Sequence, residues 1–357
     1  MLYQLLFPLN KMFFVLKYST FRAIWAAITA MAITFLIGKL VIALLKKMKA
    51  DQPIRTDGPQ SHHAKSGTPT MGGIMIIIAV LVSVLLWARL DNNFIWLTLF
   101  VFTWFAALGG VDDYLKLSKK NSKGISIRIK LLGQLLGAGL VVLYLVGHPI
   151  LPDYDTFIKI PLMKHPADLG LLYFAFVALV IVSFSNAVNF TDGLDGLATG
   201  SLIFSVLSVA VVAYVVGNVK FSDYLRILYV KEASELVIFC AAVVGACLGF
   251  LWFNCHPAQV FMGDIGSLAL GASIGMIAVL VKQELLMVLI GGIFVVEAVS
   301  VLLQILSFRV LGKRIFKMAP LHHHFELSGV HETKIVVRFW IVTIIIALVS
   351  LSFLKLR

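Results

Sequence analysis

Long apolar stretches follow one another along this chain, and each is about as long as a helix that crosses a lipid bilayer. Such a helix needs ~20 mostly apolar residues, because the hydrocarbon core offers no water to polar groups. We predict about ten of them, in a single integral membrane domain that covers residues 1–357. They run roughly over residues 21–45, 71–90, 94–111, 129–146, 169–188, 198–216, 236–252, 265–281, 285–308 and 339–354.

The composition agrees with a membrane protein and excludes other classes. Hydrophobic residues make up 60% of the chain and charged residues only 13%, against ~25% charged residues in soluble domains. Such a chain cannot cover a water-facing surface, so a soluble enzyme, a disordered chain and a nucleic-acid module are excluded. The three cysteines, an odd number in a long chain, do not form a disulfide scaffold. The predicted fold class is an all-α polytopic membrane protein.

Lysine and arginine are distributed unevenly between the loops that alternate across the membrane. The loops at residues 46–70, 112–130, 189–197, 253–264 and 309–338 hold 17 of these basic residues. The other loops and both termini, counted with Arg22 and Arg89 near the span ends on that side, hold 12. Because cytoplasmic loops carry the excess, we expect the first set to face the cytoplasm. No small-residue cleavage site precedes the first span, so we expect that span to remain as an anchor.

An acidic pair, Asp112-Asp113, stands where the third span meets the expected cytoplasmic side. A central carboxylate costs ~2.5–3.5 kcal/mol on membrane-insertion scales, and adjacent carboxylates also repel each other. The pair therefore needs a cation, a shared proton or basic partners. The plainer interpretation is a helix end that is solvated by the basic loop after it.

A second polar group recurs at every third position, and such neighbours share one face of a helix. Its members are Asn186, Asn189, Asp192 and Asp195. The glycines among them let the backbone approach a ligand closely, and amides beside carboxylates suit a sugar, a base or a hydrated cation. A helix cap would explain one of the aspartates at most.

A third acidic position, Asp264, lies between two glycines at the start of the eighth span. It is either a helix cap or part of the same site as the other four aspartates. Five aspartates that converge on one membrane surface would bind a divalent cation. Mg²⁺ prefers oxygen ligands and commonly takes one or two carboxylates together with substrate phosphates and water.

Basic residues and histidines occur on the same predicted side. Lys65 lies in a turn-rich loop and suits an anionic or carbonyl-bearing ligand, and Lys130 lies at the mouth of the fourth span. Both also fit the ordinary positive charge of cytoplasmic loops. Three adjacent histidines, His322, His323 and His324, point ~100° apart on a helix and do not chelate one ion well, but they would contact phosphate oxygens. A buried structural histidine is the alternative.

Carboxylates, Mg²⁺, basic residues and histidines at a membrane face are typical of phosphoryl transfer, in which positioning and charge neutralisation dominate. The cation would bridge a diphosphate, and a carboxylate would orient or deprotonate the attacking oxygen. We therefore expect an active-site cleft that faces the cytoplasm. A nucleotide-sugar donor would enter from the cytoplasm, and a lipid phosphate would enter between the helices.

Five segments resemble the family of phospho-N-acetylmuramoyl-pentapeptide transferases, within the polyprenyl-phosphate N-acetylhexosamine-1-phosphate transferase superfamily. They are Ser61–Gly73, Gly109–Lys116, Asn186–Ala198, Phe253–Gly271 and Arg314–Gly329, in the family's order. The resemblance implies transfer from UDP-MurNAc-pentapeptide to undecaprenyl phosphate, with release of UMP, formation of lipid I and a need for Mg²⁺. It also implies ten helices in the bacterial cytoplasmic (inner) membrane, both termini periplasmic, a role in peptidoglycan synthesis, and a homodimer.

The resemblance also implies roles for individual residues. Asp264 matches the magnesium ligand, Asp112 and Asp113 match an essential acidic pair, and Lys130 matches a basic neighbour of that pair. Residues around the uridine pocket are matched by Asn189, Asp192, Asp195 and Phe261, and the loop that closes it by Lys65 and Thr70. Polar residues of the cleft are matched by Asn186, Asn254 and the three histidines.

Two alternative functions remain at this stage. A sibling enzyme would transfer N-acetylglucosamine 1-phosphate instead, although the histidine segment favours the muramoyl family. An ion-coupled transporter would need ionisable residues near the bilayer midplane, and Glu297, with Ser300 and Gln304 on the same helix face, is the candidate. We interpret this polar stripe as the wall of the substrate-binding cleft or as an interhelical hydrogen bond.

Two further questions stay open. The lipid phosphate would attack the donor directly, assisted by Asp112, or an aspartate would first form a phospho-enzyme. We favour direct attack, because a phosphate monoester with a second pKa of about 6 is already a nucleophile near neutrality. Gly133-x-x-x-Gly137 and Gly245-x-x-x-Gly249 predict close helix contacts within the chain or between two copies.

Overall fold

The computed structural model describes residue 2 and residues 11–48, 67–119, 124–161, 163 and 165–355. Within these ranges α-helices dominate, and two short antiparallel strands, β1 (Phe157–Ile158) and β2 (Ala167–Asp168), form a small hairpin. Nine described helices are long and apolar enough to cross a membrane. The predicted all-α polytopic fold class is therefore confirmed.

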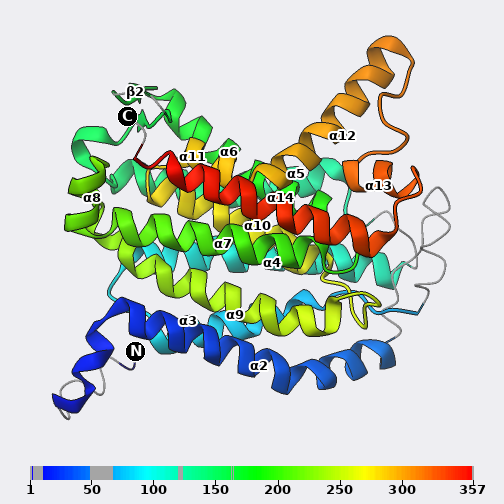
Figure 1. Ribbon diagram of the computed structural model, residues 1–357, viewed down its shortest axis with the longest axis horizontal. Helices are drawn as coiled ribbons and strands as arrows, with labels where there is room; N and C mark the ends of the chain where they lie inside the picture. The colour runs from blue at the N-terminus through cyan, green and yellow to red at the C-terminus, as the bar shows by residue number, and fades with distance from the viewer. Residues whose placement is uncertain are drawn as a thin grey trace.

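The long helices form a bundle in which neighbours run side by side (Figure 1). They are α2 (Ser19–Lys47), α4 (Asn93–Ser118), α5 (Ile127–Gly147), α6 (Leu172–Thr191), α7 (Leu197–Val216), α9 (Leu236–Asn254), α10 (Gly263–Leu280), α12 (Gly292–Leu311) and α14 (Glu332–Ser352). Shorter helices are α3 (Gly73–Trp87), α8 (Val219–Leu225), α11 (Glu284–Ile290) and α13 (Leu321–Glu326). One-turn to two-turn 3₁₀ helices are η1 (Lys11–Lys17), η3 (Pro152–Tyr154) and η4 (Lys231–Glu235).

Several helix ends differ from the predicted spans. Helix α4 continues to Ser118 instead of ending near residue 111, and α14 begins at Glu332 instead of near residue 339. Apolar composition marks where lipid-compatible residues stop, whereas a helix continues while its polar side chains find partners. The stretch predicted as residues 285–308 is two helices, α11 and α12, which meet at Gly291, a residue type at which helices commonly change direction.

Helix α10 lies at the centre of the bundle, and all its residues from Gly266 to Leu280 are buried. Glycines bring its neighbours unusually close. A Cβ atom at Gly109 of α4 would lie 2.2 Å from the carbonyl oxygen of Asp264, and one at Gly73 of α3 would lie 2.5 Å from the backbone nitrogen of Gly266. These contacts place the first turn of α10 directly against α4 and the first turn of α3.

Both predicted glycine motifs are used inside the chain. Gly133 and Gly137 of α5 pack against Leu108 and Trp104 of α4. The second motif, in α9, packs in the same way against the backbone of α2. The close helix contacts expected from these motifs are therefore intramolecular.

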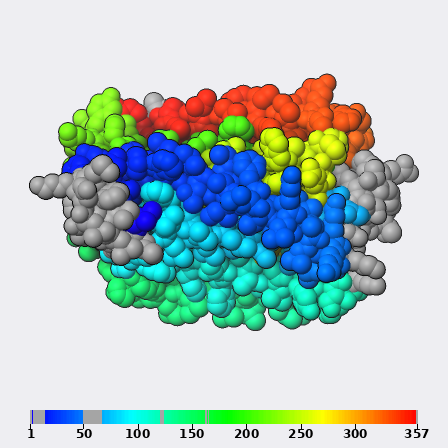
Figure 2. All heavy atoms as spheres, turned by 90° about the horizontal axis from the view of Figure 1, so that it is seen from below, coloured from blue at the N-terminus to red at the C-terminus, as the bar shows by residue number. Residues whose placement is uncertain are grey.

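The outside of the bundle is apolar, as lipid contact requires. Helix α2 lies along the face that Figure 2 turns toward the viewer, and its Leu36 and Leu40 are among the most exposed large apolar side chains, together with Leu302 of α12. Helix α2 begins and α14 ends at the same end of the bundle, on the left in Figure 1. The loops that carry the predicted acidic groups lie at the opposite end.

Candidate active site

The acidic pair lies inside α4, not in a loop after it. Asp112 and Asp113 are only 3% and 2% exposed. The Nζ atom of Lys116, one helical turn further on, lies 2.7 Å from Oδ2 of Asp112 and 3.7 Å from Oδ1 of Asp113. The pair is therefore stabilised by a basic partner on its own helix, and the interpretation as a solvated helix end is wrong.

Two other helices complete this group. The Nζ atoms of Lys116 and Lys130 of α5 lie 3.0 and 2.6 Å from Oδ2 of Asp264, in the first turn of α10. Lys130 also lies 3.5 Å from Asp112. We call the three aspartates and two lysines the carboxylate–lysine cluster.

Backbone N–H groups orient the carboxylates of this cluster. Ile125 donates to Oδ1 of Asp112 at 2.6 Å, and Ile265, in the first turn of α10, donates to Oδ2 of Asp113 at 3.1 Å. The positive end of a helix dipole favours an anion at such a position. The side chain of Asp264 accepts a hydrogen bond from Asn189 instead of capping α10, so the interpretation of Asp264 as a cap is wrong.

Helix α6 ends at Thr191. This end separates Asn186 and Asn189 from Asp192 and Asp195, which the sequence predicts on one helix face. Asn189 donates to Oδ1 of Asp264 at 2.8 Å, and its Nδ2 also donates to Ser267. The backbone N–H of Gly263 bonds to Asp192. Burial, with the nearby carboxylates of Asp264 and Asp113, raises the pKa of Asp192 to about 7. Asn189 and Asp192 therefore border the carboxylate–lysine cluster.

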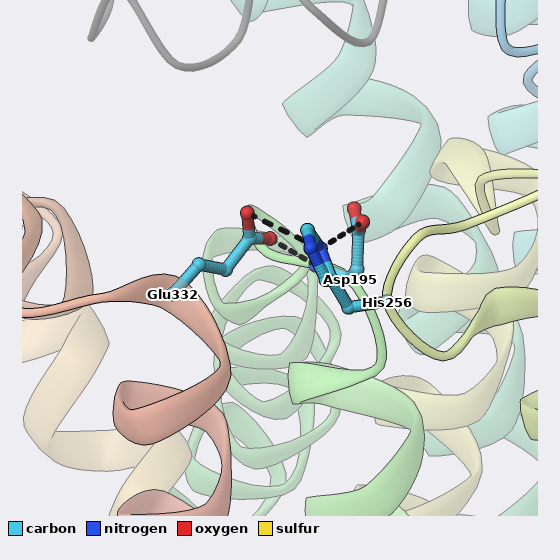
Figure 3. A group of neighbouring side chains, drawn as sticks. All are labelled: Asp195, His256 and Glu332. Atoms are coloured by element: carbon cyan, nitrogen blue, oxygen red, sulfur yellow. Dashed lines mark hydrogen bonds and ion pairs between the residues drawn. The ribbon is translucent and has the colours of Figure 1, made fainter.

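The other two members of that polar group lie elsewhere. Asn186 exchanges hydrogen bonds with Gln134 of α5, at 2.9 and 3.3 Å. Asp195 follows the chain turn after α6 and lies beside His256 and Glu332, a separate group drawn in Figure 3. The expectation that all four residues share one helix face is wrong, because α6 ends between Asn189 and Asp192.

Asn254 is the last residue of α9, and Phe261 lies in the connection between α9 and α10. The side chain of Asn254 is buried, accepts a hydrogen bond from Thr199 and donates to the carbonyl of Val260. Phe261 is bonded through its backbone to Pro69 and Gly72. The buried Thr70 lies between Pro69 and Gly72, in the segment before α3. Its Oγ1 would be 3.0 Å from a Cβ atom on Gly263. The segment from Pro69 to Gly72 therefore lies directly over the start of α10. Lys65 lies outside the described residues.

The histidine segment forms the short helix α13 beside α12. His322 is fully buried, with its Nδ1 3.3 Å from Oε2 of Glu297, and its ring packs against the backbone of Gly193. His323 lies 3.2 Å from Glu326 through its Nδ1. Since the carboxylate of Glu297 accepts the backbone N–H groups of Leu321 and His322, it does not provide the free membrane carboxylate that the transporter alternative requires.

The loop between α12 and α13 is attached to both helices. Gln304 donates to the carbonyl of Phe316 at 3.1 Å and accepts its N–H at 3.0 Å. His324 accepts the N–H of Lys317 at its Nδ1. Both side chains thus stabilise the loop that precedes the three histidines.

A cavity of about 370 Å³ lies at the other end of the bundle. It is lined by residues at the start of α4 and the end of α5, including Phe94 and His148, and by the segment that contains Tyr229 and Glu232. Phe94 and Asp113 are far apart, because 19 residues of α-helix span ~28 Å. This cavity is therefore not part of the carboxylate–lysine cluster.

Comparison with known proteins agrees with this arrangement. The family profile described as "Glycosyl transferase family 4" matches residues 94–282, and "Phospho-N-acetylmuramoyl-pentapeptide-transferase signature 1" matches residues 65–77. Proteins named phospho-N-acetylmuramoyl-pentapeptide-transferase from Citrifermentans bemidjiense and Geobacter sp. strain M21 are each 53% identical to this chain. One from Thermodesulfovibrio yellowstonii is 50% identical, and all three alignments cover 100% of both chains. The chain belongs to the phospho-N-acetylmuramoyl-pentapeptide transferase family.

In this transferase, Lys116 is the cluster residue that sequence reasoning did not select. Apolar composition predicts that the third span ends at residue 111, which places Lys116 in the basic loop after it. Lys116 follows Asp113 by three residues and Asp112 by four, and on a continuous helix this spacing predicts that it contacts both. Gln134 and Glu332 were missed too, because their partners come from distant segments.

The cluster has the donor set that a hard divalent cation prefers. Its three aspartates supply carboxylate oxygens from two helices, and the ammonium group of Lys116 lies among all three of them, within 3.7 Å of each. The carboxylate oxygens therefore surround a positive charge at the place where the Lys116 ammonium group lies. Hard divalent cations prefer such oxygen ligands, so the residues of the transferase fit a divalent metal ion.

Proposed function

We propose that this protein transfers phospho-N-acetylmuramoyl-pentapeptide from its UDP-linked donor to undecaprenyl phosphate, which releases UMP and forms lipid I. Full-length identity of 50–53% to proteins named for this activity supports the proposal. The single observation that carries its chemistry is the convergence of Asp112, Asp113 and Asp264 on Lys116 and Lys130.

In the proposed reaction an oxygen of the lipid phosphate attacks the sugar-linked phosphorus of the donor. The new P–O bond joins the lipid phosphate to the sugar phosphate, and the old P–O bond of the diphosphate breaks, so UMP leaves with its own phosphate. Negative charge on the transferred and leaving phosphates must be neutralised as the bonds exchange. Lys116 and Lys130 are fixed in place by the aspartates and provide positive charge without reorganisation.

Mg²⁺ is the proposed cofactor, and Asp264 is its proposed ligand beside the acidic pair Asp112 and Asp113. When bound, it would supply further neutralisation of the diphosphate. Asp112 would orient the lipid phosphate, which needs no base because its second pKa is about 6. Direct attack is therefore the proposed mechanism.

The remaining site residues are assigned by their distance from this cluster. Asn189 and Asp192 border it, and Phe261 lies in the connection that leads into α10, so these residues would face the uridine end of the donor. Thr70 and Lys65 belong to the adjoining connection, and His323 with His324 would contact phosphate or peptide groups. Asp195 remains a proposed neighbour of the nucleotide. Asn186, Asn254 and Gln304 are held by protein partners and would act by positioning these segments.

The proposed location is the bacterial inner membrane, with the carboxylate–lysine cluster on the cytoplasmic side. The distribution of basic residues along the sequence supports this orientation, since the loops predicted to be cytoplasmic hold 17 of the lysines and arginines. A soluble UDP-linked donor would reach the cluster from that side. The lipid phosphate would arrive through the bilayer.

The test is release of UMP by the purified protein in detergent, supplied with both substrates. We expect release that depends on both substrates, stops with chelator and returns with Mg²⁺. Asp264→Asn should lower kcat by at least about 100-fold, whereas Asp168→Asn, in the exposed hairpin, should not. Equal use of UDP-N-acetylglucosamine would contradict the assigned donor. A phosphorylated Asp112 or Asp113 after incubation with donor alone would contradict direct attack.

A further inference from the structure

Three side chains outside the carboxylate–lysine cluster converge on one point at the surface. Asp195 comes from the turn after α6, His256 from the connection after α9, and Glu332 from the first turn of α14 (Figure 3). Their ligand atoms all lie within 4.8 Å of one another. The Nδ1 atom of His256 lies 3.1 Å from Oδ2 of Asp195 and 3.7 Å from Oε2 of Glu332.

These separations are close to those between ligands of a tetrahedral metal ion. With metal–ligand bonds of ~2.0–2.1 Å, neighbouring ligand atoms are ~3.3 Å apart. One imidazole with two carboxylates is a donor set for borderline transition ions such as Zn²⁺, whereas Mg²⁺ prefers oxygen ligands alone. The chemistry of this trio therefore differs from that of the carboxylate–lysine cluster.

Backbone groups hold the two carboxylates in position. Oδ2 of Asp195 accepts the N–H of Ala258 at 3.1 Å, and Oε1 of Glu332 accepts the N–H of Asp195 at 2.9 Å. Such outer contacts orient metal ligands in known sites. They also connect all three segments before any ion binds.

The trio is accessible to solvent through His256. Asp195 and Glu332 are buried, but the side chain of His256 is 36% exposed and opens the trio to solvent. The ring of the exposed His331 lies 6.1 Å from that of His256, centre to centre. Either this ring, after a side-chain rotation, or water would complete four-coordination.

We propose that Asp195, His256 and Glu332 bind a divalent transition-metal ion of the Zn²⁺ type. The bound ion would connect the turn after α6, the connection before α10 and the start of α14. Two of these segments continue directly into Asp192 and Asp264. Asp195 is also a proposed neighbour of the nucleotide, so the test measures metal binding in the absence of substrates.

The test uses Co²⁺ as a spectroscopic probe on the full-length protein in detergent, purified through a tag that contains no histidine. We expect one equivalent of Co²⁺ to give the visible absorption of a four-coordinate site, Zn²⁺ to remove it, and excess Mg²⁺ to leave it. His256→Gln should weaken Co²⁺ binding by at least about tenfold. Glu332→Gln should do the same while its amide oxygen still accepts the N–H of Asp195.

Control variants separate this site from the other histidines and from the transfer reaction. His148→Gln, at the far end of the bundle, and His323→Gln, in α13, should retain the absorption, as should Asp264→Asn. Absence of the band in the unmodified protein, or an unchanged band in His256→Gln, would overturn the proposal. Loss of the band in His323→Gln would place the ion at α13 instead and overturn it too. Failure of UMP release bears on none of these results.

Discussion

Glu297 holds His322 from within a membrane-spanning helix. Its Oε2 atom lies 3.3 Å from Nδ1 of His322, and its two carboxylate oxygens accept the backbone N–H groups of Leu321 and His322 at 2.7 and 3.2 Å. Both side chains are fully buried. A buried carboxylate is costly in a membrane protein unless it is paired, so this residue connects α12 to α13 at a single, specific place.

Replacing Glu297 by Gln should disturb the histidine helix without unfolding the bundle. The amide still accepts one backbone N–H but loses the charge opposite His322 and one acceptor oxygen. We expect kcat for UMP release to fall by about 10–100-fold, as when outer contacts of a site are removed. Glu297→Asp should recover part of this loss. Activity equal to that of the unmodified protein would show that α13 is positioned by other contacts.

Lys116 should be needed for transfer, because its ammonium group contacts all three aspartates of the cluster. Lys116→Met keeps the length of the side chain but leaves the carboxylates with one cation fewer. We expect a loss of at least about 100-fold in kcat, measured as UMP release. The matched control is Lys119→Met, an exposed residue at the end of the same helix. Equal losses in both variants would indicate a general effect of surface charge.

Gly109 should be required for the contact between α4 and α10. A Cβ atom there would lie 2.2 Å from the carbonyl oxygen of Asp264, so Gly109→Ala must push the two helices apart. We expect a loss of about 1–3 kcal/mol in stability, seen as a lower midpoint of thermal unfolding in detergent, together with reduced activity. Gly139→Ala in α5 meets nothing within 4 Å and should leave the midpoint unchanged or raise it.

A buried ion pair between Arg22 and Glu235 should support the far end of the bundle. Arg22 donates to both carboxylate oxygens of Glu235, and that carboxylate also accepts the N–H of Arg89 at 2.7 Å. Glu235→Gln leaves a buried guanidinium without its counter-charge, which costs about 3–5 kcal/mol. Thermal unfolding should therefore begin at a clearly lower temperature, while kcat of the folded fraction is unchanged.

The control for that variant is an exposed pair of the same kind. Asp91 lies 2.7 Å from Arg89 with both side chains about half exposed, and such surface pairs contribute at most about 1 kcal/mol. Asp91→Asn should leave the unfolding midpoint nearly unchanged. If Asp91→Asn were as destabilising as Glu235→Gln, burial would not explain the effect.

The membrane class and the location of the acidic groups along the chain were predictable from local sequence. Apolar length shows that segments such as α6 and α10 can cross a bilayer, since each residue contributes to the transfer free energy independently of its partners. The cost of a carboxylate beside lipid likewise selected Asp112, Asp113 and Asp264 without any knowledge of the fold. The family followed from the order of the polar motifs.

Partners and helix ends were decided by tertiary packing. Hydrophobicity cannot indicate that α4 continues to Ser118, because the stabilising contacts of Lys116 include Asp264, which is 148 residues away. In the same way, the end of α6 separates Asp195 from Asn189 and directs it to His256 and Glu332. A local sequence pattern indicates which polar side chains are costly to bury. Only the folded arrangement of α4, α5, α6 and α10 determines which partners offset that free-energy cost.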